Sequence, residues 1–276
     1  MALTTAQRRR IVPFLRKHTL TVYAIVAFAY LFIPVLLVIL FSFNNVGGRF
    51  NYTWVGFTLD SWKSVFQFAE FGGVPGLFDS LLVSLRLAFF SALGATMLGT
   101  LIALALVRYQ FRGRSTTNLL LFLPMATPEV VMGSSILALF LAMRFSLGFT
   151  TLLIAHILFN ISYVVVTVKA RLQGFDRHLE EAAMDLYANE WETFRRVTLP
   201  MIMPGVFAAF LLAFALSFDD FIISNFNSGQ TVTFPLYIFG AAQRGIPPEV
   251  NVLGTLVFLV TVSIMLVNVW MQRRRV

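Results

Sequence analysis

Three carboxylates lie in otherwise apolar segments and are the first candidates for chemistry. Asp219 and Asp220 are neighbours in the stretch 217–224, and Glu129 follows a proline in another apolar stretch. A carboxylate in hydrocarbon is costly unless it faces a cavity or a counter-ion, so such an acid indicates a functional site. Successive helical residues point about 100° apart. We therefore expect one aspartate to face a cation-binding path while the other pairs or caps a helix.

Aromatic side chains near these acids could pack against a cation and its apolar stem. The candidates are Phe218, Phe221 and Tyr163. An alternative is that Asp219 or Asp220 forms a structural ion pair with Arg86, because buried acids usually find a partner.

A pair of prolines precedes Glu129. Pro124 and Pro128 each remove a backbone donor and clash with the preceding turn, so they predict a kinked or broken helix. Broken helices within a membrane persist only where protein or a water-filled cavity satisfies the freed groups. This helix is therefore expected to line a translocation path. A purely structural kink, with Glu129 near the surface, is the alternative.

Other chemistry has little support in the sequence. No lysine follows a glycine as a phosphate-binding Gly-x-x-x-x-Gly-Lys loop requires, and the three histidines are too dispersed for a metal site. His156 fits a packed, hydrogen-bonded residue better than a ligand. No pairing of nucleophile and base can be named, so an enzyme is not indicated.

The composition predicts an all-α membrane protein. Of 276 residues, 58% are hydrophobic and 12% are charged, unlike a soluble domain. Segments long enough to cross about 30 Å of hydrocarbon predict six spans in one domain covering residues 1–276. They lie at about 19–43, 79–107, 116–143, 149–170, 200–224 and 250–271. The run 221–243 is not counted, because its polar side chains would be unpaired in lipid.

The basic residues predict the orientation. With a cytoplasmic N-terminus, 16 of the 21 lysines and arginines fall in cytoplasmic segments, as the positive-inside bias requires. Both termini are then cytoplasmic, which an even number of spans allows. Because these residues meet anionic headgroups at the ends of the spans, the net charge of +8 does not indicate nucleic-acid binding.

A charged segment, 171–199, separates the fourth and fifth predicted spans. It is rich in acidic and small residues, and Ala182 and Ala183 leave a low surface that another protein can approach closely. Acidic residues at a helix start also complement the helix dipole. We predict two short helices that meet at a turn. A solvated loop without a partner is the alternative.

The order of residues in this segment resembles the EAA loop of ABC importer permeases. The resemblance is carried by Glu181-Ala182-Ala183, Leu186, Phe194, Val197, Leu199-Pro200 and Pro204-Gly205. In that family the loop is a coupling helix that seats in a cleft of a cytoplasmic ATPase subunit. By resemblance, the coupling residues are Glu180, Glu181, Ala182, Ala183, Asp185, Leu186, Tyr187, Ala188 and Asn189.

The resemblance also implies partners. These are a homologous permease subunit, two ATP-binding cassette subunits and an extracytoplasmic substrate-binding protein. ATP and Mg²⁺ would be bound by the ATPase subunits, with no cofactor on this chain, and the complex would lie in a prokaryotic inner or plasma membrane.

One position departs from the family pattern. The family usually has glycine where this chain has Tyr187, at a turn that favours a left-handed residue. Asparagine tolerates that conformation better than most residues. We therefore expect Asn189 to adopt it instead, or the turn to have a different geometry.

The cargo is suggested by a second resemblance. The Asp219–Asp220 segment and Pro247-Pro248-Glu249-Val250-Asn251 are similar to the second permease subunit of spermidine/putrescine importers. This implies a polyamine cargo, whose ammonium groups would meet the carboxylates and aromatic rings named above. Importers for ferric ion, thiamine, a phosphonate or an opine are alternatives in the same class. An ATP-independent channel or secondary transporter is the alternative from a different class.

Overall fold

The computed structural model describes residues 5–46, 50–66, 76–174, 176, 178–245 and 247–273. Arg49, Arg177, Arg274 and Arg275, which the orientation count used, lie outside the described residues. The described chain is helical, and its one strand-like pairing is an isolated bridge between Asn44 and Phe57. The all-α prediction is therefore confirmed. The chain forms two compact units, residues 1–75 with 241–276, and residues 76–240.

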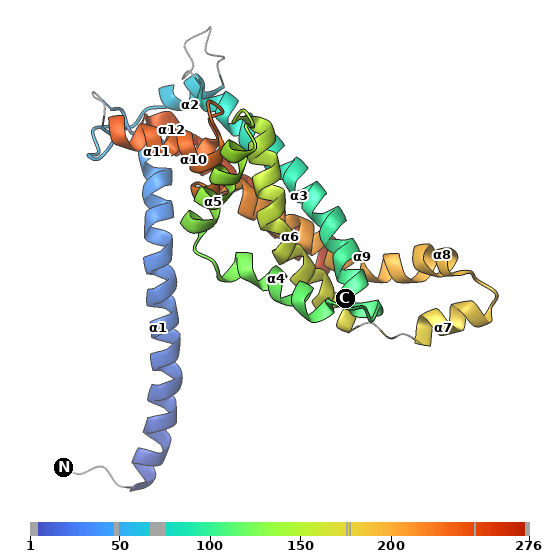
Figure 1. Ribbon diagram of the computed structural model, residues 1–276. Helices are drawn as coiled ribbons and strands as arrows, with labels where there is room; N and C mark the ends of the chain where they lie inside the picture. Colours follow the sequence, from blue (N-terminus) through green and yellow to red (C-terminus); the bar gives the residue numbers. More distant parts are fainter. Residues whose placement is uncertain are drawn as a thin grey trace. The chain divides into compact units, whose positions relative to one another are not determined.

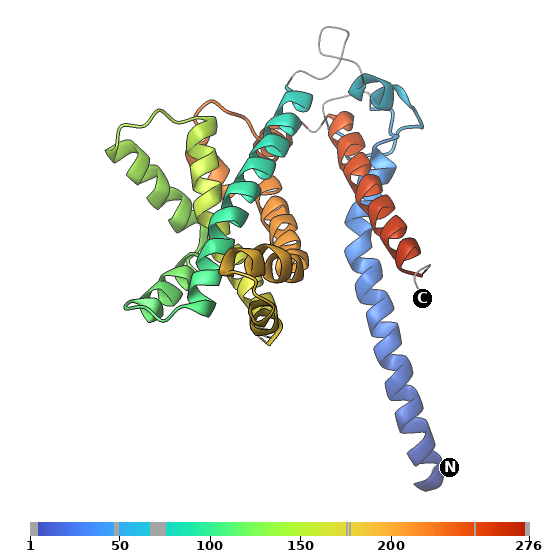
Figure 2. The ribbon, with the colours of Figure 1, turned by 90° about the vertical axis from the view of Figure 1, so that its right-hand side faces the viewer.

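The first unit contains α1 (Thr5–Phe41), α2 (Asp60–Val65) and α12 (Pro248–Arg273). Helix α12 packs against α1 and α2, and Figure 2 shows α1 and α12 side by side. Ser64 donates a hydrogen bond to the Glu249 carboxylate at 3.0 Å, which joins α2 to the start of α12. None of the residues in the apolar stretch Thr19–Phe41 is fully buried against the rest of the chain. It therefore needs lipid or another subunit around it.

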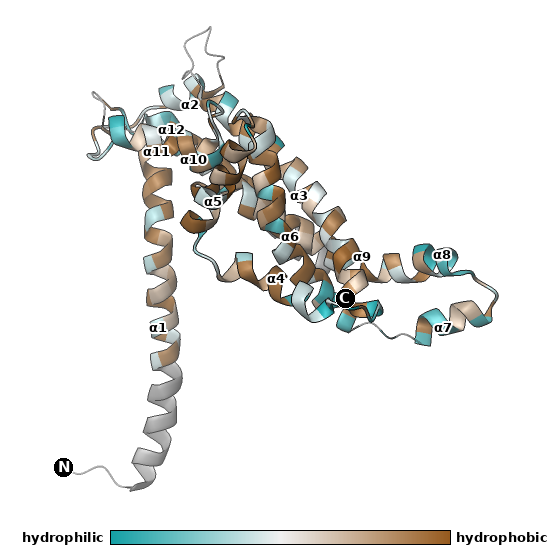
Figure 3. Cartoon of the chain, viewed as in Figure 1, coloured by the Kyte–Doolittle hydropathy of each residue, from teal (hydrophilic) through white to brown (hydrophobic). Residues whose placement is uncertain are grey.

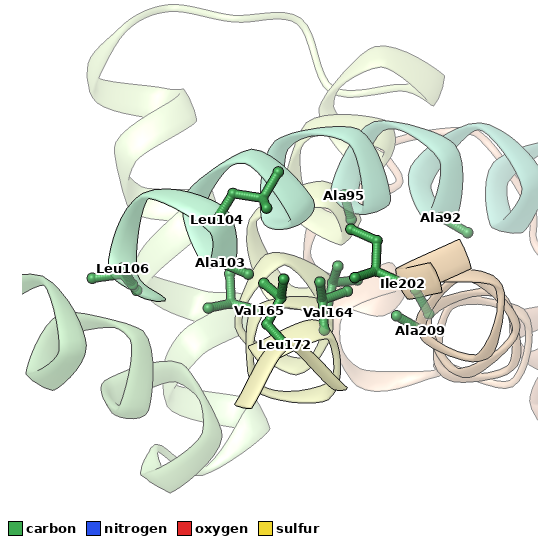
Figure 4. Packing of buried hydrophobic residues seen from close by; sticks show 12 residues of the cluster. Ala92, Ala95, Ala103, Leu104, Leu106, Val164, Val165, Leu172, Ile202 and Ala209 are labelled. Atoms are coloured by element: carbon green, nitrogen blue, oxygen red, sulfur yellow. The ribbon is translucent and has the colours of Figure 1, made fainter. Parts of the chain in front are cut away.

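The second unit is built on three helices that pack on one another (Figure 1), α3 (Leu77–Arg108), α6 (Phe149–Gln173) and α9 (Leu199–Phe218). Their contact is close because α3 presents a stripe of small residues. Ser91, Ala95, Gly99 and Ala103 recur every fourth residue and are all buried, the pattern that lets helix backbones approach. A Cβ atom added to Gly99 would lie 2.6 Å from Val164 of α6. Figure 4 shows the apolar side chains that fill the centre of this contact.

The helix that carries the proline pair is broken. Helix α4 (Arg114–Ala126) ends just before Thr127 and Pro128, and α5 (Glu129–Ala142) begins immediately after them at 110° to α4. Pro124 lies within α4. Residue 127 is extended, as expected for a residue that precedes a proline.

Helix α9 is also shorter than the span predicted at 200–224. It ends at Phe218, and after Asp219–Phe221 the chain forms α10 (Ile222–Asn227) and then α11 (Phe234–Arg244). The two aspartates thus lie at a break between helices rather than inside one. The described residues include four helices long and apolar enough to cross a membrane, or five when α4 and α5 count as one span, and a shorter apolar helix at Pro248–Ser263. The chain is a multi-pass membrane protein.

Candidate functional site

The charged segment between α6 and α9 forms a projecting arm, defined here as residues 178–198. It consists of α7 (His178–Asp185), α8 (Glu190–Thr193) and the π-helix η2 (Phe194–Thr198), which continues into α9. Figure 1 shows α7 and α8 extending beyond the ends of α6 and α9. In Figure 3 both helices carry hydrophilic positions that contrast with the mostly apolar α6 and α9.

In the turn between α7 and α8, Asn189 does not adopt the left-handed conformation that we expected for it. Tyr187 itself adopts the left-handed conformation, with φ of 64°. Asn189 is extended and caps α8. Its side chain accepts a hydrogen bond from the Glu192 amide at 2.9 Å, and the Glu192 carboxylate accepts one from the Asn189 amide at 3.3 Å. The prediction for Asn189 was wrong because this reciprocal cap requires an extended residue.

The predicted coupling residues differ in accessibility. Leu186 and Tyr187 are 81% and 98% exposed at the tip of the arm. Glu181, Ala182, Asp185 and Asn189 are also exposed, whereas Ala183 and Ala188 are half-buried. A second protein can therefore reach α7 and the turn after it. Glu180 behaves differently from the rest.

The Glu180 carboxylate is directed into the unit. It accepts hydrogen bonds from the Arg108 guanidinium at the end of α3 and from the Thr198 hydroxyl at the end of η2. The Glu180 side chain is only 14% exposed. Glu180 therefore fixes α7 to the end of α3 and to the last residue of η2, next to the start of α9.

The base of the arm carries an exposed ion pair. The Asp176 carboxylate lies 2.6 Å from His178 Nδ1. This hydrogen bond raises the pKa of His178 and lowers the pKa of Asp176. The raised pKa of His178 makes the pair stabilising below the ordinary histidine pKa of about 6.5. That contribution is lost as pH rises through the folded-state pKa.

The two aspartates at the end of α9 differ from each other as Glu180 and Glu181 do, because one is bonded within the unit and the other is exposed. Asp220 accepts hydrogen bonds from the Ile223 amide at 3.2 Å and the Ser224 amide at 2.8 Å, so it caps α10. Its side chain is 5% exposed. Asp219 is exposed. Among the described residues, no ion pair joins either aspartate to Arg86.

A buried polar network surrounds Asp220. His156 of α6 lies 2.7 Å from Ser217 through Nδ1, and through Nε2 it lies 3.2 Å from Ser224 and 3.5 Å from Asp220. Ser217 also contacts Ser91 of α3 at 2.6 Å. The sequence did not reveal this grouping of serine, histidine and aspartate. Because His156 and Ser224 are fully buried, a substrate cannot reach them as in a hydrolase, and the network acts to join α3, α6, α9 and α10.

Aromatic pairs flank the exposed Asp219. The Phe218 ring stacks on Phe234 of α11 at 6.3 Å, and the Phe221 ring lies 4.6 Å from Phe239 of α11. Two aromatic contacts therefore bracket the break between α9 and α10. They combine with one accessible carboxylate, a set of groups suited to an organic cation.

Glu129 and Tyr163 are placed elsewhere in the unit. Glu129 is the exposed first residue of α5. Tyr163 packs with Phe159 of α6, at 5.1 Å between ring centroids, against the cluster around Ile223. In the part of the chain that the structure describes, no hydrogen bond joins Glu129 or Tyr163 to Asp219 or Asp220.

The comparison with protein families identifies the chain. Residues 95–275 match the model of the binding-protein-dependent transport system inner membrane component. The chain belongs to this family. It is therefore a transport permease component, not an enzyme, and the matched residues include the arm, the broken helix and the aspartate pair.

Curated relatives of this permease cover nearly its whole length. It is 38% identical to the spermidine/putrescine transport system permease protein PotC of Haemophilus influenzae, over 90% of this chain and 94% of that protein. Identity to PotC of Escherichia coli K12 is 40%, over 87% of this chain and 89% of that protein. Identity to the putrescine transport system permease protein PotI of the same strain is 35%, over 89% of this chain and 87% of that protein.

A solved structure shares the fold of this permease. It is the crystal structure of a bacterial ABC transporter involved in the import of the acidic polysaccharide alginate, with a TM-score of 0.63 and 16% identity over 99% of each chain. At this level of identity the likeness concerns the fold alone.

Several residues of this permease site were missed by sequence reasoning. Phe234 and Phe239 lie in the run 221–243. This run is free of charges without being a span, which could have indicated that it packs beside α9 and α10. Arg108 and Thr198 gave no such signal, because they are 90 residues apart.

Proposed function

We propose that this chain is a transmembrane permease subunit of an ATP-driven importer for polyamines such as spermidine and putrescine. The observation that carries the proposal is its 35–40% identity, over nearly the whole chain, to permeases named for those two substrates. The exposed Asp219 and the paired phenylalanine rings beside it are consistent with a cargo of ammonium groups joined by methylenes.

We further propose six spans with both termini in the cytoplasm. These spans would be α1, α3, the α4–α5 pair, α6, α9 and α12. The arm would then lie on the cytoplasmic side of the membrane. The basic residues near the arm, including Arg108, Arg171 and Arg195, support this orientation. The compartment would be the inner or plasma membrane of a prokaryote.

The arm is proposed to be the coupling element. Its exposed residues Glu181, Leu186 and Tyr187 would dock on an ATPase subunit that binds ATP and Mg²⁺, while this chain binds no cofactor of its own. Closure of two such subunits would move the arms and shift the permease between outward-open and inward-open states. The complete importer would contain a homologous permease chain, two ATPase subunits and an extracytoplasmic binding protein.

Asp219 is proposed as the carboxylate of the substrate path, because it is accessible and no side-chain partner occupies it within the described chain. Asp220 would support it by capping α10. Further candidates for the substrate path are Glu129, Phe218, Phe221 and Tyr163. The break between α4 and α5 at Thr127–Pro128 is a candidate for a part of the path lining where polar groups are tolerated.

The test is uptake by the reconstituted importer. Proteoliposomes containing both permease chains, the ATPase subunits and the binding protein should accumulate labelled spermidine or putrescine only with ATP. Unlabelled thiamine, ferric citrate, a phosphonate and an opine serve as competitors. Competition by one of these but not by polyamines would reject the proposed cargo, and uptake without ATP or ATPase subunits would reject the proposed class.

A further inference from the structure

We infer that Arg108, Glu180 and Thr198 form a latch that transmits movement of the arm to α3 and α9. The inference rests on the proposed coupling function and assigns a positioning role to three residues. The Glu180 carboxylate accepts hydrogen bonds from both other side chains, and Arg108 Nη2 lies 3.2 Å from Thr198 Oγ1. One contact point thus connects α7, the last residue of α3 and the last residue before α9.

The partly buried surroundings of the latch strengthen its hydrogen bonds. The side chains of Arg108 and Glu180 are 26% and 14% exposed, and Thr198 is fully buried. Hydrogen bonds between ionised groups are about twice as strong as neutral ones, and partial removal from water reduces their screening. Removal of either charge would leave the other partly buried and unpaired, which is unfavourable.

The latch matters mechanically because little else fills the space beside it. An open groove of about 670 Å³ separates the end of α3 from the arm. Its lining includes Leu104, Tyr109, Met184 and Trp191 as well as Arg108 and Glu180 of the latch. Apolar packing therefore does not fix α7 against α3 across this groove. The Arg108–Glu180 ion pair links them directly.

The other route from the arm to the core runs through η2. Five residues of π-helix, Phe194–Thr198, connect α8 to α9, and π-helical turns are frequent at functional sites. The start of α9 is itself held by α6. Arg171 donates hydrogen bonds to the Met201 carbonyl at 3.0 and 3.2 Å, and its stem crosses Gly205, where an added Cβ would lie 2.6 Å away. With the latch closed, displacement of α7 acts on Thr198 and α3 together, so η2 cannot absorb it.

Glu180 and Glu181 therefore have separate tasks. Glu181 is exposed for docking, whereas Glu180 carries the resulting movement inward. A defect in Glu180 should lower the amount of substrate imported per ATP hydrolysed without releasing the ATPase subunit. A defect in docking should instead reduce ATPase binding.

The experiment uses the complete importer in proteoliposomes. Glu180→Gln, Arg108→Gln and Thr198→Val are compared with the wild type for substrate imported per ATP hydrolysed and for co-purification of the ATPase subunit. We expect the ratio to fall about fivefold or more in the first two variants, less in Thr198→Val, and co-purification to be unchanged. The double variant Arg108→Glu/Glu180→Arg should restore a large part of the ratio. Arg112→Gln, an exposed arginine four residues after Arg108, is the matched control and should leave the ratio unchanged.

A second measurement does not depend on transport. Hydrogen exchange of the α7 amides, followed in the assembled complex, should be faster in Glu180→Gln than in wild type. A wild-type import ratio in Glu180→Gln and Arg108→Gln would overturn the latch, as would failure of the charge-reversed pair to restore it. Absence of ATP-driven import in the wild-type complex would instead reject the proposed function.

Discussion

Two acidic pairs, one at each end of the α9 region, show the same division of labour. In the arm, Glu180 is bonded to Arg108 and Thr198 while Glu181 is exposed. After α9, Asp220 caps α10 beside His156 while Asp219 is exposed. In each pair one carboxylate holds the structure together and its neighbour is left accessible to a partner or a ligand.

The order within the pair differs between the two regions. The first acid is the structural one in the arm, and the second is the structural one after α9. The cause lies in distant partners, Arg108 of α3 for Glu180 and His156 of α6 for Asp220. Adjacent residues face different directions, but only the tertiary contacts decide which of them faces inward.

The largest effect should separate Asp219 from Asp220. Asp219→Asn should lower polyamine import by about tenfold or more, because a hydrogen bond to a charged group contributes about 1.5–3 kcal/mol. Asp220→Asn should retain most of the import, because an amide oxygen can still accept from the Ile223 and Ser224 amides. Uptake is measured per assembled complex. Equal losses in both variants would remove the distinction between the two carboxylates.

The next effect concerns the network that holds Asp220 in place. His156→Leu should lower the free energy of unfolding by about 3 kcal/mol, because Ser217 and Ser224 each lose a buried hydrogen bond and Asp220 loses the polar ring beside it. Thermal unfolding in detergent measures this. Leu158→Ala, at an exposed position of the same helix, is the control and should change stability far less. A His156→Leu protein as stable as the wild type would contradict the assigned role.

A smaller effect is expected at the turn of the arm. Asn189→Ala removes the side chain that caps α8 and should cost about 1 kcal/mol in the local stability of the arm. Asn189→Ser should retain most of it, since serine is also a good cap. Hydrogen exchange of the amides of residues 190–198 gives the readout. Unchanged exchange in Asn189→Ala would show that the cap does not hold the arm.

The smallest effect is expected at Tyr187. Its left-handed conformation costs a non-glycine residue about 1–2 kcal/mol, part of which glycine would regain. Tyr187→Gly should therefore slow hydrogen exchange in the arm slightly, and Tyr187→Val should accelerate it. Faster exchange in Tyr187→Gly would mean that the tyrosine ring stabilises the turn by more than its backbone strain costs.

Local sequence signals predicted much of this architecture. The apolar runs indicated the long helices, and the prolines indicated the break between α4 and α5. Each of these features depends on residues close together in the chain. The two short helices of the arm follow from the same kind of signal.

Features that depend on distant residues could not be predicted in this way. Glu180 meets residues 72 positions before it and 18 after it, and His156 meets serines 61 and 68 positions away. The end of α9 at Phe218 was missed for a related reason. Apolar residues resume at Phe221 after the two aspartates, which favoured one continuous helix. The break is stabilised by the Asp220 cap and by α11 rather than by a proline or glycine.

The most direct test of the coupling proposal uses the absence of native cysteines. A single cysteine is introduced as Leu186→Cys at the tip of the arm, and Asn45→Cys, in an exposed loop after α1 predicted to face outside, is the comparison. In the assembled importer, a short thiol cross-linker should join position 186, but not position 45, to the ATPase subunit. In intact cells a membrane-impermeant thiol reagent should label only position 45. Labelling of position 186 from outside, or its failure to cross-link to the ATPase subunit, would contradict the central claim that the arm is a cytoplasmic coupling element.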